Sequence, residues 1–364
     1  MKKKIQIIIT CLLFFFITSI LSIYSASNIN NLENLYIKQI IYYFLGIILL
    51  LFAYNYKSYI SKYSKIIYFT NLFLLAIVLL FGIKINGSKC WLILGPFSFQ
   101  PSEFMKIVLV FIIANLFEKY KRKRKFKDEF IMIIKLLFYI SIPSILIFLE
   151  PDTGIIIIFF IITLAMIIYR GLNKKWIFFL SSIMLFLIIC GLTIYYTRID
   201  LIEKMLSSNF FYRLDRLTNW HSGQGYQLEN SLTTIASAGL LGFGFNNNPL
   251  YFPEATTDFI FTTISSNTGF IGSIIFIITT IIFDINILIM CNKKTNKYNQ
   301  YLIIGFVSML FYQQIQNISM TIGLLPITGI TLPFISYGGT SLLSYMFILG
   351  IILRIKRDNK RYLN

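Results

Sequence analysis

Four short segments of this 364-residue chain carry the residue types that could do chemistry. They place Asp, Glu, Lys, Trp, Tyr and Ser next to Gly and Pro, at residues 87–106, 150–154, 225–261 and 317–341. Carboxylates accept protons or bind cations, and a lysine ammonium neutralises an anionic group. These residue types make the four segments the candidates for a functional site.

Asp258 is the first candidate, as a general base or as a ligand to a divalent cation such as Mg²⁺ or Mn²⁺. It directly precedes a long apolar run and follows Glu254 by four residues. A partly desolvated carboxylate at that place could accept a proton or face diphosphate oxygens together with a cation. The alternative is that Asp258 caps the N-terminus of the following helix. We also expect Gln227, earlier in the same segment, and Glu254 to contact a substrate.

Lys106 is the second candidate for a functional-site residue. Pro101 suits the start of a helix and Glu103 suits its first turn, which places Lys106 about one turn inside an apolar run. An ionisable residue at that depth faces the protein interior or a polar cavity. Alternatively, its long side chain extends to the headgroups. Trp91 could bind substrate or belong to an interfacial aromatic belt.

The two remaining segments add carboxylates and hydroxyls. Glu150-Pro-Asp152-Thr-Gly154 forms a tight turn between two apolar runs, where Asp152 could hold a cation, pair with Lys106 or cap the next helix. The Gly- and Pro-rich stretch 317–341 cannot be a regular helix. Non-helical backbone in a membrane lies against protein or a polar cavity, to which Ser336 and Tyr337 would offer hydroxyls.

The elements that position these residues must be membrane helices. Hydrophobic residues make up 57% of the chain and charged residues only 13%, too few charges for a soluble protein of this size. The apolar runs are continuous, which favours helices of about 20 residues. We predict an all-α polytopic membrane protein, a single domain over 1–364, with ten spans at 5–25, 37–55, 65–83, 102–118, 131–149, 153–170, 175–196, 260–290, 300–322 and 336–354.

Charge sets the predicted orientation. The net charge of +18 comes from Lys and Arg in short clusters between apolar runs, which argues for topology determinants rather than a nucleic-acid site. Most of these residues fall on the side of the two termini, so both termini are predicted to be cytoplasmic. The opposite side carries the four polar segments. Its largest element is the predicted extracellular loop 197–259 between the seventh and eighth spans.

Taken together, the four segments resemble the signature of the SEDS family, which comprises RodA, FtsW and SpoVE. The strings that carry the resemblance are Trp91…Gln100-Pro-Ser-Glu103…Lys106, Glu150-Pro-Asp-Thr-Gly154, Thr257-Asp-Phe-Ile-Phe261 and Leu332-Pro-Phe-Ile-Ser-Tyr-Gly-Gly339. They follow one another in the family's order and at its loops. The resemblance covers the chain from the first span to the last.

The resemblance implies a peptidoglycan glycosyltransferase that polymerises lipid II outside the cytoplasmic membrane and releases undecaprenyl diphosphate. It maps the family's essential aspartate onto Asp258, its tryptophan onto Trp91 and its lysine onto Lys106. We assign Lys106 as a contact to the diphosphate, with Lys89 as a second candidate. The implied partner is a class B penicillin-binding protein, a transpeptidase, beside other divisome or elongasome proteins.

The chain departs from the family pattern at three positions. Many members carry two consecutive glutamates after the aspartate motif, whereas this chain has Ser266 and Asn267, and Cys90 stands where Arg is frequent. The strings around Gly225 and Gly329 favour the FtsW/SpoVE branch, in division or sporulation, whereas the string from Asn317 favours RodA and elongation. We favour the first branch.

Two other classes of protein fit parts of the pattern. A lipid II flippase would also need broken helices and a polar cavity, although its ionisable groups should gather nearer the midplane. A non-catalytic scaffold for the transpeptidase is the other alternative, which the replacements at 266 and 267 keep open.

Overall fold

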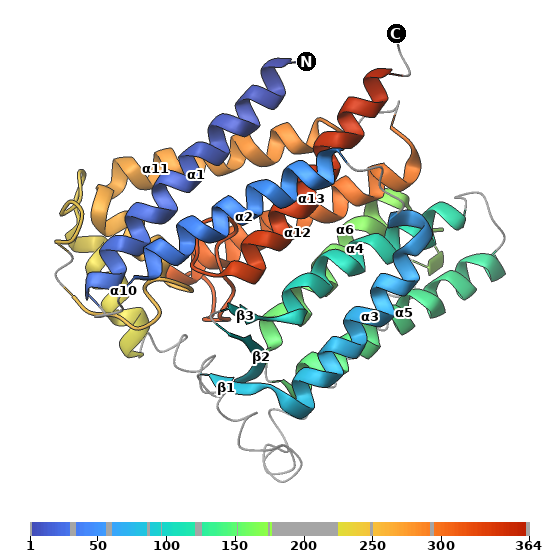
Figure 1. Ribbon diagram of the computed structural model, residues 1–364, viewed down its shortest axis with the longest axis horizontal. Helices are drawn as coiled ribbons and strands as arrows, with labels where there is room; N and C mark the ends of the chain where they lie inside the picture. Colours follow the sequence, from blue (N-terminus) through green and yellow to red (C-terminus); the bar gives the residue numbers. More distant parts are fainter. Residues whose placement is uncertain are drawn as a thin grey trace.

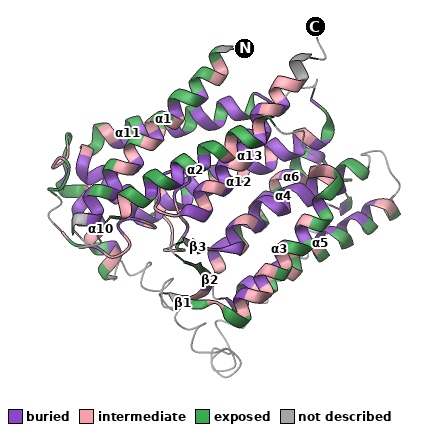
Figure 2. Cartoon of the chain, viewed as in Figure 1, coloured by how far each residue is buried: buried purple, intermediate pink, exposed green. Residues whose placement is uncertain are grey.

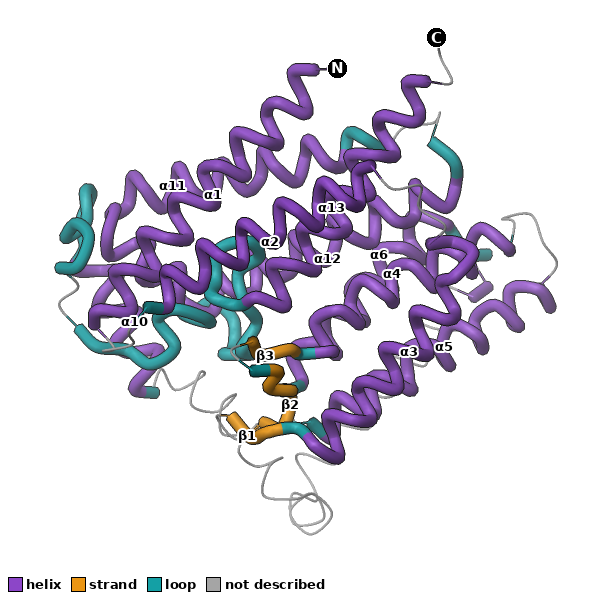
Figure 3. The backbone as a smooth tube through the Cα atoms, viewed as in Figure 1, coloured by secondary structure: helices purple, strands orange, loops and turns teal. Residues whose placement is uncertain are grey.

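The chain folds into a bundle of long helices whose two termini lie at one end (Figure 1). The computed structural model describes residues 2–29, 34–55, 60–85, 88–95, 97–120, 126–150, 152–173, 175–176, 225–247, 250–291 and 295–361. A small sheet and a short helix lie at the end opposite the termini, together with most of the non-helical segments (Figure 3). This is the end that carries the motif segments.

Nine of the ten predicted spans are helical in the described residues. The helices are α1 (Lys2–Ile29), α2 (Leu35–Asn55), α3 (Ile60–Phe81), α4 (Pro101–Lys119), α5 (Phe126–Leu149), α6 (Thr153–Arg170), α11 (Ile260–Leu288), α12 (Lys297–Thr321) and α13 (Gly339–Arg361). The predicted span 175–196 lies outside the described residues, apart from 175–176. Seven described helices are long and apolar enough to cross a membrane, namely α1, α2, α3, α5, α6, α11 and α13. The prediction of a polytopic helical membrane protein is thus confirmed.

α4 and α12 are more polar because they are surrounded by protein. Fifteen of the 19 residues of α4 and 15 of the 25 residues of α12 are buried. The outer helices, by contrast, bury one face and expose Ile, Leu and Phe on the other (Figure 2). A helix shielded from lipid needs no apolar surface, so it can carry the ionisable and amide side chains of the site.

The prediction of an all-α fold is wrong in one detail, because the α3–α4 connection is a small antiparallel sheet. Its strands are β1 (Ile83–Ile85), β2 (Ser88–Leu94) and β3 (Phe97–Phe99), in the order β1-β2-β3. The predicted third span reached residue 83, but α3 ends at Phe81. Hydropathy alone does not distinguish an apolar strand from the end of an apolar helix.

α11 is broken near its start, and a neighbouring loop takes over the hydrogen bonds that the break leaves open. Gly269 has a non-helical backbone, with φ 66°. The N–H groups of Phe243 and Gly244 donate to the carbonyls of Ser266 and Asn267. On the other side of the break, the N–H groups of residues 270 and 271 donate to the carbonyls of residues 239 and 240. The loop 239–244 therefore completes α11 at the point where its own ladder fails.

This close approach requires glycine. A Cβ on Gly269 would lie 2.4 Å from the nitrogen of Gly242 and 2.5 Å from the carbonyl oxygen of Leu240. The loop that holds Gly242 follows α10 (Tyr226–Ser237), a short helix within the predicted extracellular loop 197–259. The described part of that loop is therefore ordered and packed on the bundle.

We predict that Gly269→Ala lowers the melting temperature of the purified protein in detergent micelles. The strained φ alone costs about 1–3 kcal/mol, and the collision with the 239–244 loop adds to it. Gly239→Ala is the matched control, because Gly239 lies in the same loop with φ 60° but has nothing within 4 Å of its Cβ position. Equal losses in the two variants would show that the close approach contributes nothing.

Candidate active site

The candidate site is built on the non-helical segment 322–338, which connects α12 to α13 and which we call the α12–α13 segment. Its residues Ile330, Leu332, Phe334 and Ile335 are buried among the helices. Buried backbone without its own helical ladder needs other hydrogen-bond partners. The surrounding helices supply these partners from their side chains.

α1 and α2 hold the second half of this segment. Ser19 Oγ donates to the carbonyl of Ile335 at 2.7 Å, and Tyr43 donates its hydroxyl to the carbonyl of Phe334. Gln39 Nε2 donates to the carbonyl of Ser336 at 3.3 Å, and Gln39 Oε1 accepts from the N–H of Gly338 at 3.4 Å. All three side chains are fully or almost fully buried. The path of this loop is therefore set by groups far away in sequence.

The same segment binds the chain that carries Asp258. The N–H of Tyr337 donates to the carbonyl of Thr256 at 2.8 Å, and Ser336 Oγ donates to the carbonyl of Thr257 at 2.7 Å. Ser336 Oγ also accepts from the N–H of Leu332 at 2.8 Å. Ser336 and Tyr337 thus fix the backbone of residues 256–257. A contact from these two residues to a substrate stays a prediction.

Asp258 is placed by Asn317, a residue that we did not predict as part of the site. Asn317 Nδ2 donates to the carbonyls of Asp258 and Ile330, both at 2.8 Å, so α12 ties the two segments together. The carboxylate of Asp258 lies beside Gly329, because a Cβ on Gly329 would be 3.4 Å from Asp258 Oδ2. Asn317 opens the motif segment 317–341, but Gln313, Gln314 and Gln316 precede it, so its polarity alone did not single it out.

Asp258 is not a helix cap. The N-cap position of α11 belongs to Phe259, with no side-chain cap bond, and Asp258 keeps partial exposure. Asp258 thus lies one residue before the N-cap position. The carboxylate is half-buried at the end of the bundle, where a substrate could reach it.

Glu254 shapes the turn before Asp258. Its carbonyl accepts from the N–H groups of Thr257 and Phe259, at 3.1 and 3.0 Å, and its carboxylate accepts from the hydroxyl of Thr257. Its own backbone has φ 57°, an uncommon conformation for a residue other than glycine. A contact from Glu254 to a substrate stays a prediction.

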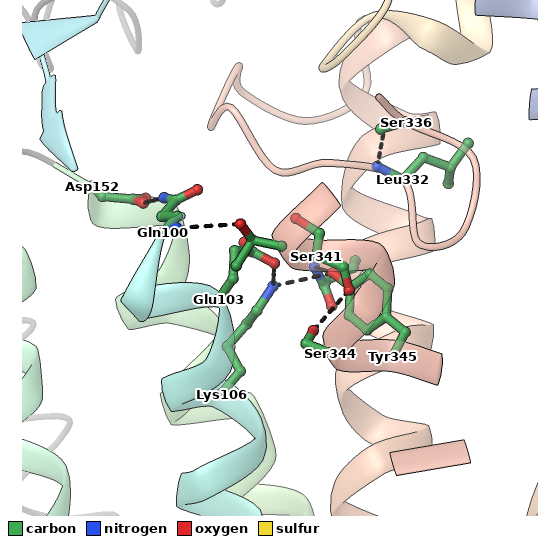
Figure 4. A network of polar contacts seen from close by, with 11 residues as sticks. Gln100, Glu103, Lys106, Asp152, Leu332, Ser336, Ser341, Ser344 and Tyr345 are labelled. Atoms are coloured by element: carbon green, nitrogen blue, oxygen red, sulfur yellow. Dashed lines mark hydrogen bonds and ion pairs between the residues drawn. The ribbon is translucent and has the colours of Figure 1, made fainter. Parts of the chain in front are cut away.

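Gln100, in the first motif segment just before α4, is bonded to the second segment at the start of α6 and to the fourth segment at the start of α13. Gln100 Nε2 donates to Asp152 Oδ2 at 3.0 Å, as Figure 4 shows. The backbone N–H of Gln100 donates to Thr340 Oγ1, which in turn donates to the carbonyl of Ser98. Asp152 occupies the N-cap position of α6 but makes no side-chain cap bond. Its carboxylate is directed to Gln100 rather than to its own helix or to Lys106.

α6 also touches the α12–α13 segment. A Cβ on Gly154 would lie 2.9 Å from the carbonyl oxygen of Thr328 and 2.9 Å from the side chain of Ile330. Since Gly329 faces the Asp258 carboxylate, the residues 328–330 lie between the start of α6 and Asp258. The second, third and fourth motif segments therefore meet at the α12–α13 segment, and the first is bonded to α13 through Gln100 and Lys106.

Lys106 is fully buried and does not extend to the headgroups. Its Nζ lies 2.8 Å from Glu103 Oε2 and donates to the hydroxyl of Tyr345 at 3.1 Å. Figure 4 shows the side chain reaching from α4 toward Tyr345 on α13. The alternative of an extended, headgroup-bound lysine is wrong, because an ion pair inside the bundle already holds the ammonium. A contact to an anionic substrate stays a prediction.

The other predicted contacts lie apart from this network. Lys89 Nζ donates to the carbonyls of Leu79 and Leu80 at the end of α3, at 2.9 and 2.8 Å, and so supports that helix end. Trp91 lies on β2 and Gln227 in the first turn of α10, both partly exposed. The structure leaves the substrate-binding role of these three residues as predictions.

Ser266 and Asn267 have a structural role in this chain. Their carbonyls receive the loop 239–244, and Asn267 Oδ1 accepts from Ser25 Oγ of α1 at 2.9 Å. Ser25 Oγ also accepts from the N–H of Asn246 at 3.1 Å. These uncharged residues are buried at the break in α11 and hold it against α1.

Glu150 is a buried carboxyl group in the turn between α5 and α6. Neither of its side-chain oxygens has a hydrogen-bond partner within the described residues, whereas its carbonyl accepts from Cys90 Sγ at 3.1 Å. Burial and, to a smaller extent, the nearby charge of Asp152 raise the pKa of the Glu150 carboxyl to about 8. Burial likewise raises the pKa of the Cys90 thiol, so both groups are uncharged at neutral pH.

The sequence of this chain is similar to those of known proteins. The family of FtsW, RodA and SpoVE, described as "Cell cycle protein", matches residues 3–361. The "Probable peptidoglycan glycosyltransferase FtsW" of Coxiella burnetii is 33% identical over 340 residues, which cover 89% of this chain and 87% of the relative. Stage V sporulation protein E of Bacillus subtilis is 31% identical over 337 residues, with the same two coverages.

Solved structures share the fold. A chain from a study of polymerization and crosslinking by a peptidoglycan synthase complex superposes with a TM-score of 0.79 at 20% identity, covering 99% of this chain and 98% of that one. The rod shape determining protein RodA of Thermus thermophilus gives a TM-score of 0.68 at 22% identity, covering 97% and 96%. The helical bundle and the path of the chain through it are therefore those of known membrane proteins.

The raised pKa of Glu150 predicts a pH-dependent stability. The carboxyl has a higher pKa in the folded than in the unfolded chain, so its contribution is complete below the ordinary pKa of about 4.5 and is lost as the pH rises through 8. Glu150→Gln should remove this loss, so the melting temperature of the variant should gain on that of the wild type between pH 5 and 9. If the melting temperatures of the two proteins changed equally with pH over that range, the raised pKa of Glu150 would be contradicted.

Proposed function

Because this chain belongs to the family of cell cycle proteins that comprises FtsW, RodA and SpoVE, we propose that it is a peptidoglycan glycosyltransferase that polymerises lipid II. The observation that carries the proposal is the meeting of the second, third and fourth motif segments at the α12–α13 segment beside Asp258, with the first segment bonded to α13. The chain is a multi-pass protein of the cytoplasmic membrane.

The proposed topology has ten membrane helices with both termini in the cytoplasm. α4 and α12 count among them, because their polar side chains are shielded by the helices around them. The span 175–196 and the extracellular loop 197–259 complete the single domain 1–364. With this orientation, Asp258 and the α12–α13 segment face the outer side, where glycan strands are made.

Asp258 is the proposed catalytic residue. The 4-hydroxyl of one lipid II sugar attacks the anomeric carbon of the growing strand, the new glycosidic bond forms, and the bond to the lipid diphosphate breaks. The carboxylate of Asp258 takes the hydroxyl proton, and undecaprenyl diphosphate leaves with the bonding electrons. Asn317 and Ser336 hold the backbone on either side of Asp258. The carboxylate is therefore in place before substrate binds.

Positive charge near the leaving group completes the proposal. Lys106 is the buried cation of the site, and Glu103 balances its charge before substrate arrives. Trp91, Lys89 and Gln227 lie on the sheet and on α10, and they would contact the substrate outside the bundle. Such cations stabilise the negative charge that develops on the diphosphate.

A divalent cation stays a prediction from the sequence. Within the part of the chain that the structure describes, no group of three or more His, Cys, Asp and Glu side chains could hold a metal ion. Asp258 and Asp152 lie on opposite sides of residues 328–330 and do not form such a group. We therefore assign no reaction step to a metal.

The proposed partner is a class B penicillin-binding protein, the transpeptidase that would cross-link the strands. One neighbour in fold belongs to a peptidoglycan synthase complex, which supports a paired polymerase and cross-linking enzyme here. The relatives named FtsW and the sporulation protein of Bacillus subtilis favour a role in cell division or sporulation over elongation.

We predict that Asp258→Asn abolishes glycan synthesis, because the isosteric amide cannot accept the proton. The loss should be at least about 100-fold in a gel assay of strands made from labelled lipid II by purified protein. Asp128→Asn, in the first turn of α5 at the other end of the bundle, is the control and should keep wild-type activity.

The same assay separates the proposal from its alternatives. A lipid II flippase would move labelled lipid II across vesicle membranes without making strands, and a scaffold would do neither. Full activity of a folded Asp258→Asn protein would remove Asp258 from the mechanism while leaving the polymerase activity itself in place.

The cation role predicts that EDTA lowers strand synthesis and that added Mg²⁺ or Mn²⁺ restores it. The physical reason is that a cation shared between Asp258 and the substrate diphosphate would have to come from solution, since the described residues offer no closed metal site. Unchanged activity in EDTA would remove the metal from the proposal.

A further inference from the structure

The ammonium of Lys106 is held at two points rather than one. Glu103 Oε2 lies at 2.8 Å on the same helix, and the hydroxyl of Tyr345 accepts from Lys106 Nζ at 3.1 Å across the gap to α13. Charge neutralisation needs only the carboxylate. The hydroxyl adds a second fixed acceptor, which restricts the rotation of an otherwise flexible side chain.

Tyr345 is itself held by α12. Gln313 Nε2 donates to the Tyr345 hydroxyl at 2.8 Å, so the phenolic oxygen accepts from two donors on two different helices. Both side chains are completely or almost completely buried. Water therefore does not compete for these hydrogen bonds, and their geometry is well defined.

Gln313 lies four residues before Asn317, so the two amides are neighbours on the same face of α12. Asn317 donates to the carbonyl of Asp258, and Gln313 donates to the group that holds Lys106. A single helix thus supports the proposed base in one turn and the buried cation in the next. No part of this connection passes through a loop.

We propose that Tyr345 and Gln313 are positioning residues, which hold the Lys106 ammonium in a fixed place relative to Asp258 with α12 as their common support. This inference rests on the proposed polymerase function. The cation so placed would act on the lipid diphosphate as it leaves, when its negative charge increases. An interaction that strengthens in the transition state affects kcat more than KM.

The test is the kinetics of strand synthesis by purified Tyr345→Phe protein. The variant keeps the ring, whose centroid lies 5.3 Å from Lys106 Nζ, and removes only the hydroxyl. We expect kcat to fall about tenfold, the effect of losing one hydrogen bond to a charged group, while KM stays within about twofold. Tyr68→Phe is the matched control, because Tyr68 is equally buried on α3 and donates to the carbonyl of Tyr139, away from the site.

A double-mutant cycle distinguishes positioning from packing. If Tyr345 acts through Lys106, adding Tyr345→Phe to Lys106→Met should cause little further loss, whereas independent effects would multiply. Gln313→Met should lower kcat in the same direction and should also not add to Tyr345→Phe.

The outcomes separate this inference from the proposed function. An active wild type with unchanged kcat in Tyr345→Phe would overturn the inference alone. Equal losses in Tyr345→Phe and Tyr68→Phe, or multiplicative losses in the cycle, would also overturn only the inference. An inactive wild type, with lipid II and cofactors supplied, would overturn the proposed function instead.

Discussion

The structure depends on satisfying the backbone of the α12–α13 segment. Seventeen consecutive residues, 322–338, leave the helical ladder inside a bundle of apolar helices, and the N–H and C=O groups of buried positions there cannot turn to water. Side chains of α1, α2 and α12 supply the missing partners. The chain of residues 256–258 supplies the rest.

This constraint explains why amide and hydroxyl groups lie deep in the protein. Gln39, Tyr43 and Asn317 would be costly in lipid, but each is bonded to a carbonyl of the α12–α13 segment or of its neighbour. It also explains why α12 and α4 occupy the centre. The many buried positions of these two helices can carry such groups without exposing them to hydrocarbon, and α1 and α2 turn the polar side chains that bond to the α12–α13 segment away from lipid.

The break in α11 also leaves backbone groups that need hydrogen-bond partners. Its open hydrogen bonds are taken by main-chain groups of the loop 239–244, so two glycines allow one backbone to lie against the other. As a result, the chain on both sides of Asp258 is fixed, by the α12–α13 segment before α11 and by the loop at its break. A carboxylate supported in this way keeps its place while it stays partly exposed.

Hydropathy, charge clusters and motif strings were enough to predict the helices and the motif residues. Continuous apolar runs and clustered charge specify which residues form long helices, because lipid permits few other structures. The Gly- and Pro-rich string from 328 to 339 showed where the helix must stop. Hydropathy could not reveal the strands β1 to β3, since their residues are as apolar as the helix before them.

The use of the motif residues depends on contacts that form only in the folded chain. For both Asp152 and Asp258 a helix cap was an alternative interpretation, yet Asp152 accepts from Gln100 and Asp258 lies outside the cap position. Lys106 could have extended to the headgroups, but Glu103 and Tyr345 hold it inside. Such choices depend on contacts between residues up to hundreds of positions apart. The local sequence pattern does not reveal those contacts, because it does not show which partner a buried polar group will have.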